Sequence, residues 1–121
     1  MSYIDGYVIA VPTQNKQKFI EQARRSDSVF IEYGATRVNE CWGDDVKDGK
    51  LTDFRRAVQA KDDEAVVFSW IEWPDKATRD SAMPKVMNDP RLNPQSNPMP
   101  FDGKRMIFGG FSPVVQLGTG R

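Results

Sequence analysis

Residues 65–74, Ala-Val-Val-Phe-Ser-Trp-Ile-Glu-Trp-Pro, decide the fold. The run is short, rich in β-branched and aromatic residues and closed by a proline, which is typical of a strand. Side chains alternate along a strand, so the large apolar residues divide between its two faces: Val66, Phe68 and Trp70 on one, Val67, Ile71 and Trp73 on the other. A strand that is apolar on both faces must be covered on both.

The flanking sequence predicts three more strands and two helices. We expect strands over 3–12, 35–44 and 104–112, and helices from about residue 14 to 33 and from residue 75 onward. Gly34 is a natural stop for the first helix, and Asp75 is a suitable N-cap for the second. Pro84 should kink the second helix or end it near Met83. In the first helix, Phe19, Ala23 and Phe30 mark the apolar stripe, and we place Asp27 off that stripe.

This β-α-β-β-α-β order predicts a single α+β domain over residues 1–121 with a ferredoxin-like fold. Its four-stranded antiparallel sheet carries both helices on one face. Two helices supply only one covering layer, so the other sheet face needs a partner. A second copy pairing sheet to sheet would give a homodimer, a dimeric α+β barrel.

Composition excludes several classes of function. The chain has 121 residues with 17 basic and 17 acidic side chains, which argues against a nucleic-acid partner. It holds no apolar run of membrane-spanning length and no signal-peptide pattern, so we expect a cytoplasmic protein without a membrane partner. Cys41 is the one cysteine, which rules out an internal disulfide, and we expect it to be buried and inert.

The chain also has no histidine. That removes Ser-His-Asp chemistry, histidine metal sites and histidine-ligated haem. The acidic run Asp44, Asp45 and Asp48 fails the calcium-loop template, because Val46 stands at a ligand position. No glycine loop of the phosphate-binding kind is present. We therefore expect no metal and no cofactor, and any proton transfer must use another kind of side chain.

Two tryptophan–glutamate groups are the candidate site. Glu40 and Trp42 share a face of the second strand, and Trp70 and Glu72 share a face of the third. If the two faces coincide, both carboxyl groups lie beside indoles, and either glutamate could act as an acid or base. The alternative is that the tryptophans pack in a core or interface and the glutamates pair with arginines.

Three further residues have two interpretations each. Met83 and Met87 either line an adaptable apolar pocket or fill the core. Arg105 either clamps an anionic ligand or forms an exposed ion pair in a turn.

Three stretches, residues 40–46, 67–74 and 99–107, resemble the motifs of the YbaA family of small bacterial proteins. The resemblance extends from Tyr3 to Phe111. It implies the dimeric α+β barrel fold and no established activity, and fold alone does not assign chemistry.

Two functional hypotheses follow. The first is a homodimeric barrel that binds a small apolar or aromatic molecule and acts as a cofactor-independent enzyme, with Glu40 or Glu72 as acid or base. The ligand-binding candidates are Trp42, Trp70, Met83, Met87 and Arg105. The second is a non-catalytic structural or protein-interaction module. RNA binding is a third and weaker possibility, which a steep loss of affinity with salt would reveal.

Overall fold

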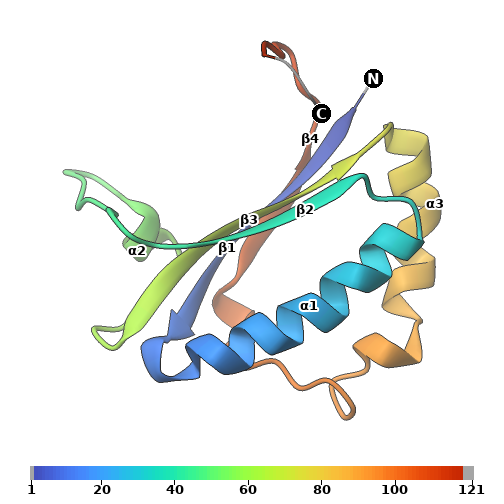
Figure 1. Ribbon diagram of the computed structural model, residues 1–121. Coiled ribbons are helices and arrows are strands. Elements are labelled where there is room, and N and C mark those ends of the chain that lie inside the picture. The colour runs from blue at the N-terminus through green and yellow to red at the C-terminus, as the bar shows by residue number, and fades with distance from the viewer. Residues whose placement is uncertain (1, 119–121) are drawn as a thin grey trace.

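Strand β3 (Glu64–Trp73) lies inside a four-stranded sheet in the computed structural model, which describes residues 2–118 (Figure 1). The other strands are β1 (Tyr3–Pro12), β2 (Arg37–Trp42) and β4 (Ile107–Phe111). The helices are α1 (Lys16–Glu32), α2 (Phe54–Ala57) and α3 (Lys76–Met87). Single 3-10 turns lie at Thr13–Asn15, Pro90–Leu92 and Gly103–Arg105.

The sheet has the order β2-β3-β1-β4, and every neighbouring pair is antiparallel. With one long helix after β1 and another after β3, this is the ferredoxin-like arrangement. The predicted α+β fold is confirmed. Strand β1 has the predicted bounds, whereas β2 and β4 are shorter than predicted. At β4 the cause is local: Asp102 accepts a hydrogen bond from the backbone N–H of Lys104 at 3.0 Å, which forms a turn where we predicted strand.

Helices α1 and α3 cover one face of the sheet, here called the helix face (Figure 1). The core on this face contains the odd-numbered residues of β1 and β3 and apolar residues of both helices, among them Val11, Phe19, Val67, Trp73 and Val86. Val11, Val67, Trp73 and Val86 are completely buried. The predicted division of β3 side chains between two faces is therefore confirmed.

The helix termini follow the sequence signals except at Pro84. Gly34 has a φ of +121°, the left-handed conformation that a helix C′ position favours. Asp75 caps α3 by accepting a hydrogen bond from the N–H of Thr78 at 2.7 Å. Helix α3 nevertheless continues past Pro84 to Met87, so the predicted end near Met83 is wrong. Pro84 and Asp80 are both exposed, which lets water solvate the Asp80 carbonyl, and buried Val86 anchors the last turn.

The opposite face, here called the outer face, is covered at one end by the segment between β2 and β3. Figure 1 shows α2 on the side of the sheet away from α1. Val58 is 1% exposed and packs with Ala10 and Val66. The Phe54 ring meets the Phe68 ring at 5.9 Å. The chain thus covers part of the face that we expected a partner to cover, and the remainder stays exposed.

The segment 88–106 runs along α1 and is hydrogen-bonded to it at several points. Near one end, the Tyr33 hydroxyl donates to Asp89 at 2.9 Å, and Arg91 pairs with Glu32 at 2.8 Å. In the middle, Arg25 donates to the Asn97 side chain at 3.2 Å. At the other end, the side-chain amide of Asn15 donates to the backbone carbonyl of residue 100 at 2.9 Å. Asn15 is the N-cap residue of α1, but its side chain makes no capping hydrogen bond. These contacts hold the segment against α1.

One buried ion pair fixes α3 to the sheet. The Asp5 carboxylate accepts hydrogen bonds from Arg79 at 2.8 and 3.1 Å and from the Trp73 indole at 2.9 Å. Asp5 is 3% exposed. A buried charge needs such partners, so these contacts set the position of α3.

Candidate functional site

Two adjoining hollows lie between α1 and the sheet. The inner hollow has a volume of about 300 Å³ and is largely apolar, with walls that include Ile9, Phe30, Ile71, Met99, Phe101 and Met106. The outer hollow has a volume of about 540 Å³ and opens toward β2 beside Lys16, Arg24, Val38 and Trp42. Both hollows are lined by Phe19, Ala23, Asp27 and Glu40. Two acidic side chains therefore lie where the hollows meet.

The carboxyl groups of Asp27 and Glu40 form a hydrogen-bonded pair. Asp27 comes from α1 and Glu40 from β2. An ionised carboxylate only accepts hydrogen bonds, so the two groups can share a hydrogen bond only when one of them holds a proton. Glu40 is exposed as a residue of an edge strand, but its carboxyl reaches Asp27 and the buried Ser69 hydroxyl on the helix face.

The environment places that proton on Asp27. Burial raises the pKa of Asp27, and the hydrogen bond to Glu40 raises it further. Burial also raises the pKa of Glu40, but hydrogen bonds from Asp27 and Ser69 act in the opposite direction and favour its ionised form. Two carboxyl groups in contact titrate as a coupled pair, and this pair retains a proton to a pH at which isolated carboxyl groups have lost theirs.

Tyr7 lies close to the pair on the floor of the inner hollow. Burial is the main cause that raises the pKa of the Tyr7 phenol, and negative charge at Asp5 and Glu40 adds to it. Tyr7 is therefore neutral near neutral pH and offers a hydroxyl. The site thus combines a protonated carboxyl, a carboxylate and two neutral hydroxyl groups beside an apolar hollow.

The two predicted tryptophan–glutamate groups lie on opposite faces of the sheet, so the condition that their faces coincide is not met. In the β2–β3 register, Glu40 is opposite Ser69 and Trp42 is opposite Val67, both on the helix face. Trp70 and Glu72 lie on the outer face. There the Trp70 indole donates to Glu72 at 2.9 Å.

The tryptophans and glutamates consequently have different surroundings. Trp42 borders the outer hollow, with its ring 6.2 Å from that of Phe19 and the Lys16 ammonium 5.2 Å from its centroid. Glu72 also lies 4.0 Å from Arg37, which matches the alternative of a glutamate paired with an arginine. Only the Glu40 half of the predicted group faces the hollows between α1 and the sheet.

The other three ligand-binding candidates are scattered. Met83 packs against the core of the helix face, and Met87, which is exposed, lines the inner hollow. Arg105 makes two hydrogen bonds of 2.7 Å to Glu64 and one of 3.0 Å to Asp102. The Arg105 guanidinium holds the pKa of Glu64 well below its ordinary value. These contacts engage the Arg105 side chain within the chain itself.

Two sequence-based expectations about side-chain placement are wrong. Asp27 does not lie off the apolar stripe of α1, since it lines both hollows. The sequence spacing indicates the true position of Asp27, because Phe19, Ala23 and Asp27 follow one another at intervals of four residues and therefore share a helix face. Cys41 is exposed rather than buried, because it points to the outer face of an edge strand.

No metal site accompanies the carboxyl pair. Within residues 2–118, no group of three or more cysteine, aspartate or glutamate side chains is arranged to hold a metal ion. The same residues include no helix long and apolar enough to cross a membrane.

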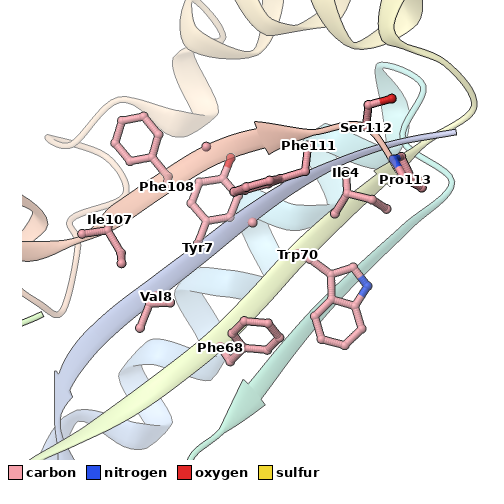
Figure 2. Close-up of a pocket in the computed structure, with 12 residues that line it drawn as sticks. Ile4, Tyr7, Val8, Phe68, Trp70, Ile107, Phe108, Phe111, Ser112 and Pro113 are labelled. Carbon is pink, nitrogen blue, oxygen red and sulfur yellow. The ribbon is translucent and has the colours of Figure 1, made fainter. Parts of the chain in front are cut away.

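A third hollow lies on the other side of the sheet from the inner and outer hollows, on the exposed part of the outer face (Figure 2). It has a volume of about 650 Å³ and is almost entirely apolar, with contributions from β1, β3 and β4 that include Ile4, Val8, Phe68, Trp70, Ile107 and Phe111. The Phe111 ring lies over Gly6 and Gly109. Phe111 is 61% exposed, so a large aromatic surface faces solvent in the single chain.

The fold and the cavity together define a class: a ferredoxin-like α+β protein with a carboxyl pair between its first helix and its sheet. Comparison with known proteins then gives the family. The chain belongs to the family described as protein of unknown function (DUF1428), whose model matches residues 2–103. The chain is 53% identical over 115 residues to the uncharacterized protein YbaA of Escherichia coli K12, an alignment that covers 95% of this chain and 98% of that protein. The YbaA protein of Shigella flexneri matches equally well. The resemblance to the YbaA family is confirmed.

Solved structures support the fold. An uncharacterized NIPSNAP domain protein from Burkholderia xenovorans matches with a TM-score of 0.57 at 13% identity, over 97% of this chain and 99% of that chain. A dimeric ferredoxin-like protein from an uncultured marine organism matches with a TM-score of 0.58 at 11% identity, over 98% of each chain. At such low identity the likeness concerns the fold alone.

Proposed function

We propose that this protein binds a small molecule with an apolar body in the inner hollow and exchanges a proton with it through Asp27 and Glu40. The observation that carries the proposal is the hydrogen-bonded carboxyl pair at the edge of an otherwise apolar hollow. Burying a carboxyl group costs free energy, and groups with strongly shifted pKa values are concentrated at functional sites.

The pair suits acid–base chemistry without a cofactor. The protonated Asp27 carboxyl can donate to a carbonyl or hydroxyl oxygen of the ligand, while the Glu40 carboxylate can accept a proton from a neighbouring atom. Tyr7 can donate a hydrogen bond to the same oxygen, while the Ser69 hydroxyl holds the Glu40 carboxylate. Glu40, one of the two glutamates predicted from sequence, thus remains a candidate acid or base, and Asp27 joins it.

The proposed working form is a homodimer in which the exposed parts of two outer faces pack together. Such packing would cover Phe68, Trp70 and Phe111 and leave the hollows beneath α1 accessible. An exposed apolar patch of this kind marks interfaces in soluble proteins. The ferredoxin-like protein from the marine organism is described as dimeric, which favours the same assembly here.

The alternative is a non-catalytic interaction module. The two hypotheses differ in what surrounds the glutamates: a hollow beside Glu40 or Glu72 favours ligand binding, whereas a filled core with both glutamates paired favours the module. Glu40 borders two hollows and Glu72 is paired on the outer face. The balance therefore favours ligand binding at the Glu40 side. A cytoplasmic location remains part of this proposal.

Native mass spectrometry of the purified protein tests the assembly and the ligand together. We expect a dimer that carries the extra mass of a co-purified small molecule. The Ala23→Leu variant should lose that mass, because Ala23 lines both hollows and is 6% exposed. Ala77→Leu is the matched control, since Ala77 is exposed on α3. A clean dimer would favour the non-catalytic module, and a monomer would refute the proposed interface.

A further inference from the structure

The outer hollow carries positive charge that has no partner among residues 2–118. Lys16 and Arg24 border it from α1, and both are exposed. Among the arginines within residues 2–118, Arg24 is the one whose guanidinium makes no hydrogen bond or ion pair; the others are engaged. The Lys16 ammonium lies over the Trp42 ring, and no carboxylate of the described residues pairs with it. Two uncompensated cations thus stand beside a hollow.

The charge changes from the outer hollow to the inner one. Lys16 and Arg24 lie at the outer hollow, the carboxyl pair lies where the hollows meet, and the inner walls are apolar. Because the pair retains a proton, it contributes at most one negative charge against the two positive charges outside. An anionic group is therefore favoured in the outer hollow, and an uncharged apolar group is favoured in the inner one.

We infer that the ligand is a small amphipathic acid, with its apolar body in the inner hollow and its anionic end beside Lys16 and Arg24. This inference rests on the proposed function and adds the ligand's charge and orientation. Trp42 borders the outer hollow and provides an apolar surface there, against which an aromatic or acyl chain can lie. The carboxyl pair then faces the middle of the ligand, where a carbonyl or hydroxyl group would meet Asp27.

Three probes of the same shape test the charge preference: 4-phenylbutyrate, 4-phenylbutyramide and 4-phenylbutylamine, which are anionic, neutral and cationic. Two-dimensional NMR titration of the full chain gives both the affinity and the place of binding. We expect the acid to bind more tightly than the amide, and the amine to bind most weakly. The amides of residues around Ala23 and Glu40 should shift, and the acid's affinity should fall with added salt.

Variants on α1 separate charge from shape. Arg24→Gln and Lys16→Gln should each weaken the acid by about two- to five-fold, the size expected for an exposed charge contact, and leave the amide unchanged. Lys18→Gln is the matched control, because Lys18 is exposed on the same helix but lines neither hollow. It should leave all three affinities unchanged.

The possible failures are distinguishable. Equal binding of acid and amide, or tighter binding of the amine, would overturn the charge assignment and leave the apolar hollow as a binding site. Binding of none of the probes, or shifts confined to the outer face around Trp70, would overturn the proposed cavity and this inference with it.

Discussion

Replacing Asp27 with asparagine should abolish a pH dependence of stability that the wild-type protein shows near neutral pH. In the unfolded chain both carboxyl groups of the pair are ionised above about pH 5.5. In the folded protein burial, and then the hydrogen bond to Glu40, raise the pKa of Asp27, so that the native state still holds one proton. The folded protein therefore binds one more proton than the unfolded chain.

The magnitude follows from that single proton. Because the pKa is raised by folding, stability is greatest below the unfolded-state value and falls as the pH rises toward the folded-state value. One extra native proton gives a slope of about −1.4 kcal/mol per pH unit in the free energy of unfolding. Between about pH 5.5 and about pH 7.5, wild-type stability should fall by about 2.7 kcal/mol.

The composition of the chain leaves few other groups that titrate in this pH range. There are no histidines, so the side chains that normally titrate in this range are absent. The α-amino group, with an ordinary pKa of about 7.7–8.0, titrates only at its upper edge. A slope observed here therefore reports on carboxyl groups with raised pKa values.

Urea unfolding followed by tryptophan fluorescence at about pH 5.5, 6.5 and 7.5, with protein concentration and ionic strength held constant, measures the slope. Asp27→Asn should be almost insensitive to pH, since its amide can still donate to Glu40 without titrating. Asp45→Asn, which removes a largely exposed carboxyl, should keep the wild-type slope. A flat wild-type profile would show that the pair holds no proton at neutral pH. A slope that survives in Asp27→Asn would show that Asp27 is not the group that holds the proton.

Two further predictions concern the attachment of α3 to the sheet and the proposed dimer interface. Arg79→Met should lower the free energy of unfolding by about 3–5 kcal/mol, because it leaves the buried Asp5 carboxylate without its ion-pair partner. Lys76→Met on the same helix breaks an exposed pair and should change the free energy of unfolding far less. Similar losses in the two variants, measured by urea unfolding, would contradict the buried role of Asp5. Trp70→Ala should weaken dimerisation by about 2 kcal/mol or more in sedimentation experiments, and unchanged assembly would exclude Trp70 from the interface.

The fold could be predicted because its signals are local. The alternation in 65–74 fixed both faces of β3, Gly34 marked the end of α1 and Asp75 marked the start of α3. The helix end predicted near Pro84 was wrong because the free-energy cost of a proline inside a helix depends on whether water can solvate the backbone carbonyl that loses its hydrogen bond. That depends on packing, which the local sequence does not show. The partial covering of the outer face by α2 could not be predicted, because Phe54, Ala57 and Val58 suggest a short helix but do not show which face of the sheet it covers.

The site was harder because it depends on the pairing of elements distant in sequence. Spacing within a strand placed Glu40 beside Trp42 and Glu72 beside Trp70, but only the β2–β3 register decides whether those faces coincide. A shift by one residue would have brought the two groups together. Asp27 is separated from Glu40 in sequence by a helix end and a turn. Its spacing from Ala23 indicates the helix face on which it lies, but the sequence does not show that Glu40 meets it there.

The fastening of segment 88–106 to α1 determines how quickly a ligand of the inner hollow can come and go. Many binding proteins close a loop over their ligand, and the opening of that loop then limits exchange. Here the segment that walls the hollow is held to α1 through Asp89, Asn97 and the carbonyl of residue 100, and these hydrogen bonds oppose its separation from the helix. Ligand residence should therefore be governed by the strength of its contacts rather than by a gate, and exchange should be fast for weakly bound molecules.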